Sequence, residues 1–154
     1  MAAVSPSIRG AVASDEASIV ALIRASYAKY VPRIGREPAP MTDDYGAEIA
    51  AGNCWVLDGP GRLSGVIVMR PKDGGWFVDT VGVDPADQGK GVGKALMAFA
   101  EAEGLRRGFR AVRLYTNAKM TENIPFYEAL GYAITGRRVE DGFDRVFFEK
   151  HLGK

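Results

Sequence analysis

The chain has 154 residues, a formal net charge of +1 and 47% hydrophobic residues. This length predicts a single globular domain over residues 1–154, large enough to bury about two thirds of the unfolded surface. The nearly neutral charge argues against a global electrostatic field for nucleic acid or an anionic membrane. A local basic patch is compatible with this charge.

The single cysteine and the single histidine exclude several kinds of catalytic centre. Cys54 has no partner for an internal disulfide, which fits a reducing compartment, and it is expected to be a small buried hydrophobe. A zinc site would lack ligands, and a Ser-His-Asp or Cys-His centre would depend on His151 near the C-terminus, so no metal or triad is expected. With no signal-peptide pattern and no apolar run near the ~18 residues of a membrane span, we expect a cytoplasmic protein.

The first third of the chain predicts one strand and two helices. An apolar run at residues 8–13 is followed by Ser14, a plausible N-cap for a helix over residues 14–30. Residues 31–41 contain several prolines and a glycine and are predicted to be a loop. A shorter helix then begins at residues 42–44 and stops before the next strand.

From Cys54 onwards the hydrophobic period changes to that of strands. Strands are predicted at residues 54–57, 63–69, 76–83, 111–115, 132–139 and 145–150, and helices at 92–107 and 123–130. The resulting order β-α-α-β-β-β-α-β-α-β-β predicts an α/β fold with a mixed sheet and helices on both faces.

Residues 81–94 (VGVDPADQGKGVGK) carry the strongest functional signal. A strand and a glycine-rich turn lead into a helix, which directs backbone N–H groups and the helix dipole to one point and so binds phosphate. A Walker A loop would need glycine at Gln88 and Ser or Thr at Ala95. A dinucleotide fingerprint starting at Gly89 would need glycine at Lys94. Neither motif fits.

The spacing Gln88-x-x-Gly91-x-Gly93 resembles the Gln/Arg-x-x-Gly-x-Gly/Ala pattern of the Gcn5-related N-acetyltransferase (GNAT) family. Residues 81–85 are similar to the fourth strand of that family, and residues 123–132 (NIPFYEALGY) resemble its Phe-Tyr-x-x-x-Gly-Phe helix end. The order of elements is similar as well, so the resemblance covers residues 8–150. It implies a mostly antiparallel sheet whose central strand pair splays apart.

The resemblance implies acetyl-CoA as the acyl donor, with its pantetheine arm in the gap between the splayed strands and its pyrophosphate at the helix start. Main-chain groups of Val81 and Val83 would lie along the arm, one of them near the thioester carbonyl. Lys90 and Lys94 are explained equally well as surface lysines. The expected cofactor-binding residues are Val81, Gly82, Val83, Gln88, Gly89, Lys90, Gly91, Val92, Gly93, Lys94, Asn123 and Tyr127.

Two residues are expected to be catalytic. Tyr127 matches the family's general acid, which protonates the departing thiolate. Asp79 is the candidate base, because strand alternation places it on the same face as Val81 and Val83 and it is the only carboxylate within that strand. Another carboxylate or a water molecule would serve as well.

The sequence departs from the family pattern where an asparagine usually contacts the pantetheine arm, because Met120 occupies that position. Asn117 and Asn123 are both candidates for this contact, and the sequence does not decide between them.

The expected function is an acetyl-CoA-dependent N-acetyltransferase that acts on a primary amine of a small molecule, amino acid or peptide by direct attack in a ternary complex. A non-catalytic acyl-CoA-binding sensor and a nucleotide-binding protein are the alternatives. The acceptor stays open, although Arg33 and Arg36 would suit a carboxylate-bearing acceptor or be surface charges. Aromatic residues in the last strands fit either a homodimer interface or the core.

Overall fold

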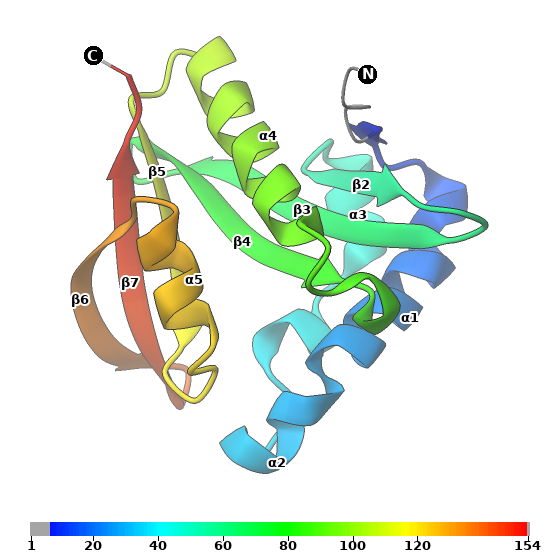
Figure 1. The fold of residues 1–154 in the computed structure, drawn as a ribbon, viewed down its shortest axis with the longest axis horizontal. Coiled ribbons are helices and arrows are strands. Elements are labelled where there is room, and N and C mark those ends of the chain that lie inside the picture. Colours follow the sequence, from blue (N-terminus) through cyan, green and yellow to red (C-terminus); the bar gives the residue numbers. More distant parts are fainter. Residues whose placement is uncertain (1–6, 154) are drawn as a thin grey trace.

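A computed structural model describes residues 7–153 of the chain. One seven-stranded sheet runs through it in the order β1-β2-β3-β4-β5-β7-β6 (Figure 1). The strands are β1 (Ile8–Gly10), β2 (Cys54–Asp58), β3 (Leu63–Lys72), β4 (Gly75–Val83), β5 (Ala111–Asn117), β6 (Ala133–Glu140) and β7 (Phe143–His151). The helices are α1 (Glu16–Tyr27), α2 (Val31–Ile34), α3 (Tyr45–Ala50), α4 (Val92–Arg106) and α5 (Asn123–Ala129).

The two central strands, β4 and β5, form the only parallel pair among the described strands. Their pairing covers only Trp76–Val78 of β4 and Val112–Leu114 of β5, although both strands continue further. Figure 1 shows them diverging beyond this point. The structure therefore confirms the predicted mixed, mostly antiparallel sheet with a splayed central pair.

The helices cover the sheet from both faces, and each face has its own apolar core. Leu96 and Met97 of α4 belong to one core, together with Trp76 of β4. Ile19 and Ile23 of α1 belong to the other core, which also contains side chains of β2 and β3. Burial of these side chains holds the helices against the sheet and so fixes where each helix end points.

Cys54 lies in the α1-side core, as expected for a small buried hydrophobe. Burial raises the pKa of its thiol to about 12. The thiol is therefore protonated at neutral pH and is a poor nucleophile.

The N-cap expected at Ser14 is wrong. Ser14 lies inside a 3-10 turn, Ala13–Asp15, that precedes α1. Asp15 organises this turn, because its carboxylate accepts a hydrogen bond from the Val12 N–H (2.8 Å) and pairs with Arg9 (2.8 Å). A carboxylate held by an arginine and an amide outcompetes the neighbouring hydroxyl.

The loop predicted over residues 31–41 is wrong in part, because Val31–Ile34 forms the short helix α2 and Ala39–Thr42 a 3-10 turn. Pro32 is tolerated because it lies in the first turn, where its missing N–H is not needed. The next helix begins close to its predicted start: Asp44 caps α3 by accepting from the Ala47 N–H at 3.0 Å.

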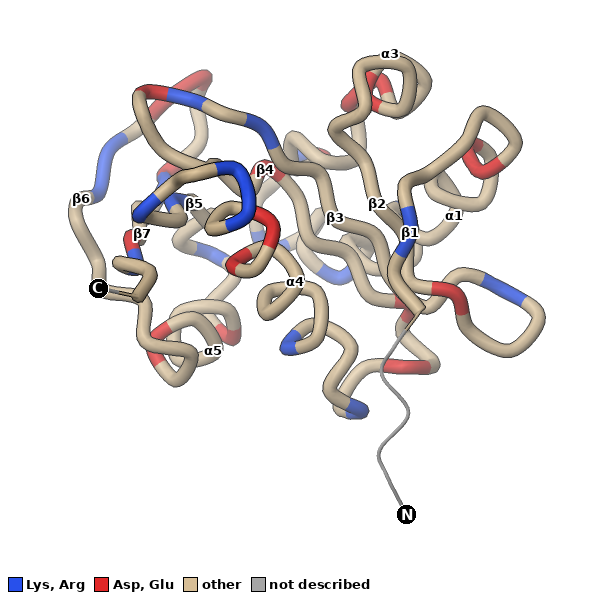
Figure 2. The backbone as a smooth tube through the Cα atoms, turned by 90° about the horizontal axis from the view of Figure 1, so that it is seen from above, with Lys and Arg blue, Asp and Glu red and all other residues tan. Residues whose placement is uncertain are grey.

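Lysine and arginine segments are mixed with aspartate and glutamate segments along the tube in Figure 2, in keeping with the net charge of +1. None of the helices in the described part of the chain has both the length and the hydropathy that a membrane span requires.

Candidate active site

The turn before α4 has the geometry of an anion site. Gly89 and Gly91 have φ angles of +80° and +83°, in the left-handed region where glycine is favoured. The first intrahelical hydrogen bond runs from the Ala95 N–H to the Gly91 carbonyl (3.0 Å). The N–H groups of residues 92–94 therefore have no acceptor inside the helix and are free to bind a negatively charged group.

Glycine is required at the third position of the motif, Gly93, for close packing and not for a left-handed backbone. A Cβ on Gly93 would lie 3.3 Å from the Phe126 ring, so glycine lets α5 pack closely against the start of α4. The Gln88 side chain donates a hydrogen bond to the Val83 carbonyl (3.2 Å) and fastens the turn to the end of β4. The motif thus joins β4, α4 and α5 at one place.

A cleft of about 460 Å³, here called the α4 cleft, lies between α1, the start of α4 and α5. The residues expected to bind the cofactor line it, with the exception of Gly82 and Lys90. Gly82 packs against α1, since a Cβ there would lie 2.7 Å from the Ile23 side chain. Lys90 is exposed, and its ammonium lies 3.8 Å from Asp87.

Asp87 anchors the loop that leads into the glycine turn. Its carboxylate accepts two hydrogen bonds of 2.9 Å from Arg62. Burial disfavours the charged form, but hydrogen bonds from Ser64 and Arg62 outweigh it and hold the pKa of Asp87 below its ordinary value. Asp87 is therefore ionised at neutral pH and keeps the loop in place.

Two side chains of α1 bind the open edge of β4. The Tyr27 hydroxyl donates to the Val81 carbonyl at 2.7 Å, and the Val83 N–H donates to the Ser26 hydroxyl at 3.4 Å. In an antiparallel pair, the N–H and C=O of one residue point to the same side. The Val81 N–H therefore points into the gap that opens where β4 leaves β5.

Sequence reasoning missed Ser26 and Tyr27. Both are buried and lie on the α1 face that carries Ile19 and Ile23. Tyr27 shares the helical spacing of Ile19 and Ile23, which indicates that it faces the sheet, and Ser26 lies beside it on the same face. No pattern in the sequence would have indicated that they bind the main chain of β4.

Tyr127 is buried in α5, with 7% of its surface exposed. Its ring lies 5.6 Å from Phe148 and 6.0 Å from Tyr132, measured between centroids. Within residues 7–153 its hydroxyl has no hydrogen-bond partner, yet it borders the α4 cleft. Burial raises the pKa of the phenol above its ordinary value, so Tyr127 is protonated at neutral pH. It can donate a proton or a hydrogen bond to a bound molecule.

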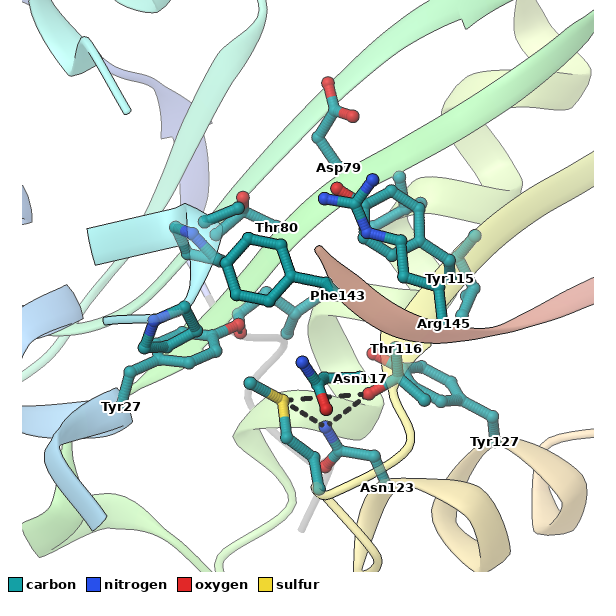
Figure 3. A pocket seen from close by; sticks show the side chains of 17 residues that line it. Tyr27, Asp79, Thr80, Tyr115, Thr116, Asn117, Asn123, Tyr127, Phe143 and Arg145 are labelled. Atoms are coloured by element: carbon teal, nitrogen blue, oxygen red, sulfur yellow. Dashed lines mark hydrogen bonds between the residues drawn. The ribbon is translucent and has the colours of Figure 1, made fainter. Parts of the chain in front are cut away.

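A cavity of about 40 Å³, here called the neck, lies between β4 and β5 where the two strands diverge, and Figure 3 shows side chains that line it. The neck and the α4 cleft share Tyr27, Val81, Asn123 and Tyr127 as lining residues. Beyond it lies a cavity of about 330 Å³, here called the outer chamber. The outer chamber and the neck share the lining residues Ala39, Pro40, Asp79, Thr80 and Tyr115.

The strand alternation that placed Asp79 beside Val81 does not hold. Val68 pairs with Thr80 and Met69 with Val78, so Asp79 sits at a β-bulge with no partner on β3. Its carboxylate pairs with Arg70 and, in Figure 3, points away from the end of the neck that holds Tyr127.

Asp79 nevertheless borders both the neck and the outer chamber. Burial is the largest influence on its carboxyl and raises the pKa above the ordinary value, while Arg70 acts in the opposite direction. Arg70 also pairs with Glu48 of α3. A role for Asp79 as base remains a prediction.

The two candidate asparagines occupy different positions. Asn123 lines both the α4 cleft and the neck, and its amide donates to the Thr116 hydroxyl at 3.1 Å. Asn117 lines the neck but not the α4 cleft, and its side chain accepts from the Lys119 N–H at 2.9 Å. Of the two, Asn123 is the one positioned beside a molecule in the α4 cleft.

Residues 18–132 match the profile of the acetyltransferase (GNAT) family. The chain belongs to this family. The match confirms the resemblance drawn from the glycine motif and the Phe-Tyr helix, and it identifies the protein as one of a family of acetyltransferases. GNAT acetyltransferases use acetyl-CoA as the acyl donor.

Curated relatives include longer proteins. A mycothiol acetyltransferase from Cellulomonas flavigena is 36% identical over 106 residues, which are 65% of this chain and 30% of the relative. Another, from Renibacterium salmoninarum, is 39% identical over 56 residues, or 36% of this chain and 17% of the relative. The chain therefore spans less than a third of the length of the curated relatives it matches.

Solved structures share the fold. The PaiA N-acetyltransferase from Thermoplasma acidophilum, in complex with coenzyme A, has a TM-score of 0.79 at 19% identity, covering 97% of this chain and all of that chain. Ard1 from Thermoplasma volcanium has a TM-score of 0.75 at 20% identity, covering 98% of this chain and all of that chain. At these identities the likeness establishes the fold alone.

Proposed function

We propose that this GNAT protein is an N-acetyltransferase that binds acetyl-CoA in the α4 cleft and transfers the acetyl group to a primary amine. One observation carries the proposal: a single cleft brings together the free helix amides of residues 92–94, the open edge of β4 at Val81 and the hydroxyl of Tyr127. A CoA thioester needs such groups at its pyrophosphate, its carbonyl and its departing sulfur. Coenzyme A in the related PaiA structure supports this assignment.

The start of α4 suits the pyrophosphate. Gly89 and Gly91, on either side of Lys90, both have a left-handed backbone conformation, which turns successive amides towards one point. The helix dipole adds positive potential at the same point. Lys94 lines the cleft and adds a formal charge. A Cβ at Gly91 would meet nothing within 4 Å, so the surface of this turn is open for a ligand.

The open edge of β4 suits the thioester. Ser26 is already bonded to the Val83 amide, which leaves the Val81 N–H as the donor that faces the gap. An amide aimed at the carbonyl stabilises the oxyanion of the tetrahedral intermediate, an effect typically worth about 2.7–4 kcal/mol. Tyr27 positions this amide, because its hydroxyl holds the carbonyl of the same residue.

Tyr127 acts as general acid in the proposal. The amine nitrogen forms a bond to the thioester carbon, the C–S bond breaks, and the departing thiolate takes the phenolic proton. The nitrogen loses one proton to solvent as the amide forms, and solvent returns a proton to Tyr127. A protonated tyrosine with no protein partner is suited to this step, because no competing hydrogen bond has to break first. Direct attack requires donor and acceptor to be bound together in a ternary complex.

The acceptor would approach through the neck, from the side opposite the donor. Asp79 lies along this route and, with a raised pKa, is a better base than an ordinary carboxylate. It would take the proton of the incoming ammonium, directly or through a water molecule. The catalytic pair therefore lies at opposite ends of the neck.

The proposal is tested by thiol release from acetyl-CoA, measured with and without an amine panel that includes the acceptor of the mycothiol acetyltransferases. Amine-dependent release of CoA, with one N-acetylated amine formed per thiol, supports it. Tight binding of acetyl-CoA with no release for any amine would favour a non-catalytic acyl-CoA sensor. Binding of ATP in place of CoA would favour a nucleotide-binding protein.

A further inference from the structure

The neck has far less free volume than the cavities on either side of it. The neck has about 40 Å³ of free volume, against about 330 Å³ in the outer chamber and about 460 Å³ in the α4 cleft. A water molecule needs about 10–15 Å³ of such volume, so the neck holds only a few heavy atoms. An acceptor that reaches the thioester has to be thin where it passes.

A bridge between two distant segments joins the walls of the neck. The Arg36 guanidinium donates to the Asp141 carbonyl and lies 3.7 Å over the Phe143 ring. The segment after Arg36 supplies Pro38 and Pro40 to one wall of the neck, and the β6–β7 hairpin supplies Phe143 to the other. The Arg36 contact therefore ties the two segments that form the walls of the neck to each other.

The two arginines that would suit a carboxylate-bearing acceptor are both engaged by the protein. Arg33 makes two hydrogen bonds to Glu122, at 2.6 and 2.9 Å, and Arg36 holds the hairpin. Neither Arg33 nor Arg36 lines the neck or the outer chamber. An anionic acceptor would therefore find neither of them along this route.

The charge of the outer chamber also disfavours an anionic acceptor. Its lining contains the carboxylates of Asp43, Glu48 and Asp79 and one cation, Arg70. Arg70 pairs with both Glu48 and Asp79, whereas Asp43 has no basic partner within the described residues. The chamber therefore carries excess negative charge, which repels an anionic acceptor and attracts a cationic one.

From these cavities and contacts we infer the acceptor class: a small molecule whose primary amine ends an unbranched arm and whose far end carries no negative charge. The inference rests on the proposed function. The small neck selects a thin arm over branched amines and peptides, the Arg36 bridge holds the two walls of the neck together, and the outer chamber selects the charge of the far end.

Four small amines matched in size, together with one peptide, test the inference through kcat/KM for thiol release. The set is n-butylamine, 1,4-diaminobutane, 4-aminobutyrate, sec-butylamine and a tripeptide with a free N-terminus. We expect 1,4-diaminobutane to exceed 4-aminobutyrate by about a hundredfold, because the charge of the far end is reversed. We expect sec-butylamine and the tripeptide to fall at least about tenfold below n-butylamine, because a branch at the amine carbon does not fit the neck.

Two substitutions separate the effect of the Arg36 bridge on acceptor shape from the effect of the outer chamber on acceptor charge. Arg36→Ala should raise kcat/KM for sec-butylamine about tenfold and leave 1,4-diaminobutane within about threefold, because the neck widens. Its matched control is Arg24→Ala, which removes an exposed arginine that pairs with Glu37 at 3.4 Å.

Asp43→Asn should lower the preference for 1,4-diaminobutane over 4-aminobutyrate about tenfold. Its matched control is Glu128→Gln, an exposed residue of α5 that lines none of the three cavities.

The outcomes separate the inference from the proposed function. Amine-dependent release that is as fast with sec-butylamine or the tripeptide as with n-butylamine overturns the inference and leaves the function standing. A preference for 4-aminobutyrate over 1,4-diaminobutane also overturns the inference and leaves the function standing. The same conclusion follows if the selectivity among acceptors is unchanged in both Arg36→Ala and Asp43→Asn. Thiol release with no member of the set, and none with wider amine panels, overturns the function and the inference together.

Discussion

The α4 cleft and the outer chamber are built in different ways. In the α4 cleft, most groups expected to face the donor belong to residues 81–94 and are main-chain amides. The outer chamber is lined by side chains of α3, β3, β4 and β5 and of the turn before α3. In the proposed function, a contiguous backbone motif would thus bind a constant donor, whereas side chains distant in the sequence would surround the acceptor.

This difference separates the effects of substitutions. A change in the α4 cleft should alter turnover equally for every acceptor, since every reaction uses the same donor. A change in the outer chamber should alter the ranking of acceptors and leave donor binding intact. Substitutions and pH profiles on the two sides test this separation.

Tyr127→Phe removes the proposed proton donor from the donor side. We expect kcat to fall at least about a hundredfold for all acceptors, the range typical of a lost general acid. The dissociation constant of acetyl-CoA, measured by calorimetry, should stay within about threefold, because the apolar contacts of the ring to Phe148 are kept.

The matched control is Tyr132→Phe, which removes a hydroxyl that donates to Glu101 at 3.0 Å and lines none of the three cavities. It should keep kcat within about threefold of the wild type, because Tyr132 touches no reacting group. Undiminished turnover in Tyr127→Phe would remove this tyrosine from the mechanism.

Tyr27→Phe tests whether the open edge of β4 is held in position by α1. Loss of the hydrogen bond to the Val81 carbonyl should lower kcat about tenfold, because the adjacent amide is no longer fixed against the thioester. The free energy of unfolding, measured with urea, should fall by about 1 kcal/mol. An unchanged kcat with this loss of stability would make Tyr27 a structural residue only.

The pH profile tests Asp79 on the acceptor side. Because burial raises the pKa of this carboxyl in the folded protein, its basic form is lost as the pH falls through a value above the usual range for aspartate. We expect the acidic limb of kcat/KM to lie at correspondingly higher pH. Asp79→Asn should remove that limb, and persistence of the limb in the variant would assign it to another group.

Glu122→Gln is expected to have the smallest effect, a slight decrease in the free energy of unfolding. Lys29 and Glu122 both line the α4 cleft, and Arg33 and Lys29 hold the pKa of Glu122 at about 2. Because the pKa of Glu122 is lower in the folded protein, its ion pair stabilises the fold at a pH above the pKa of the unfolded chain. This contribution is lost as the pH falls through about 2. Because both side chains of the pair are exposed, we expect this contribution to be smaller at pH 7 than the loss of stability in Tyr27→Phe. Urea unfolding of Glu122→Gln and the wild type at pH 7 measures the contribution, and a difference larger than that of Tyr27→Phe would contradict the expectation.

The contrast between the two regions also explains what could be predicted from the sequence. The glycine spacing of residues 88–93 and the Phe126-Tyr127 pair are local signals, so the fold class and the α4 cleft were predicted. The short helix at Val31–Ile34 was missed because its proline lies at a position in the first turn where proline is allowed.

The acceptor side could not be predicted in the same way. The bulge at Asp79 is visible only in the pairing of β3 with β4, and it moved this carboxylate towards the outer chamber. The contact of Arg36 with the β6–β7 hairpin joins segments separated by 105 residues, and no local pattern announces it. Tertiary packing determines both features.

The central claim, that the glycine turn binds the CoA pyrophosphate, is tested most directly by calorimetric titration of acetyl-CoA into Gly91→Asp and Gly91→Asn. Both side chains tolerate left-handed backbone better than most residues, and neither meets an atom at the Cβ position, so the two variants differ mainly in charge. We predict that Gly91→Asn binds within about tenfold of the wild type and that Gly91→Asp binds at least about a hundredfold more weakly. Equal affinities in the two variants would contradict the claim.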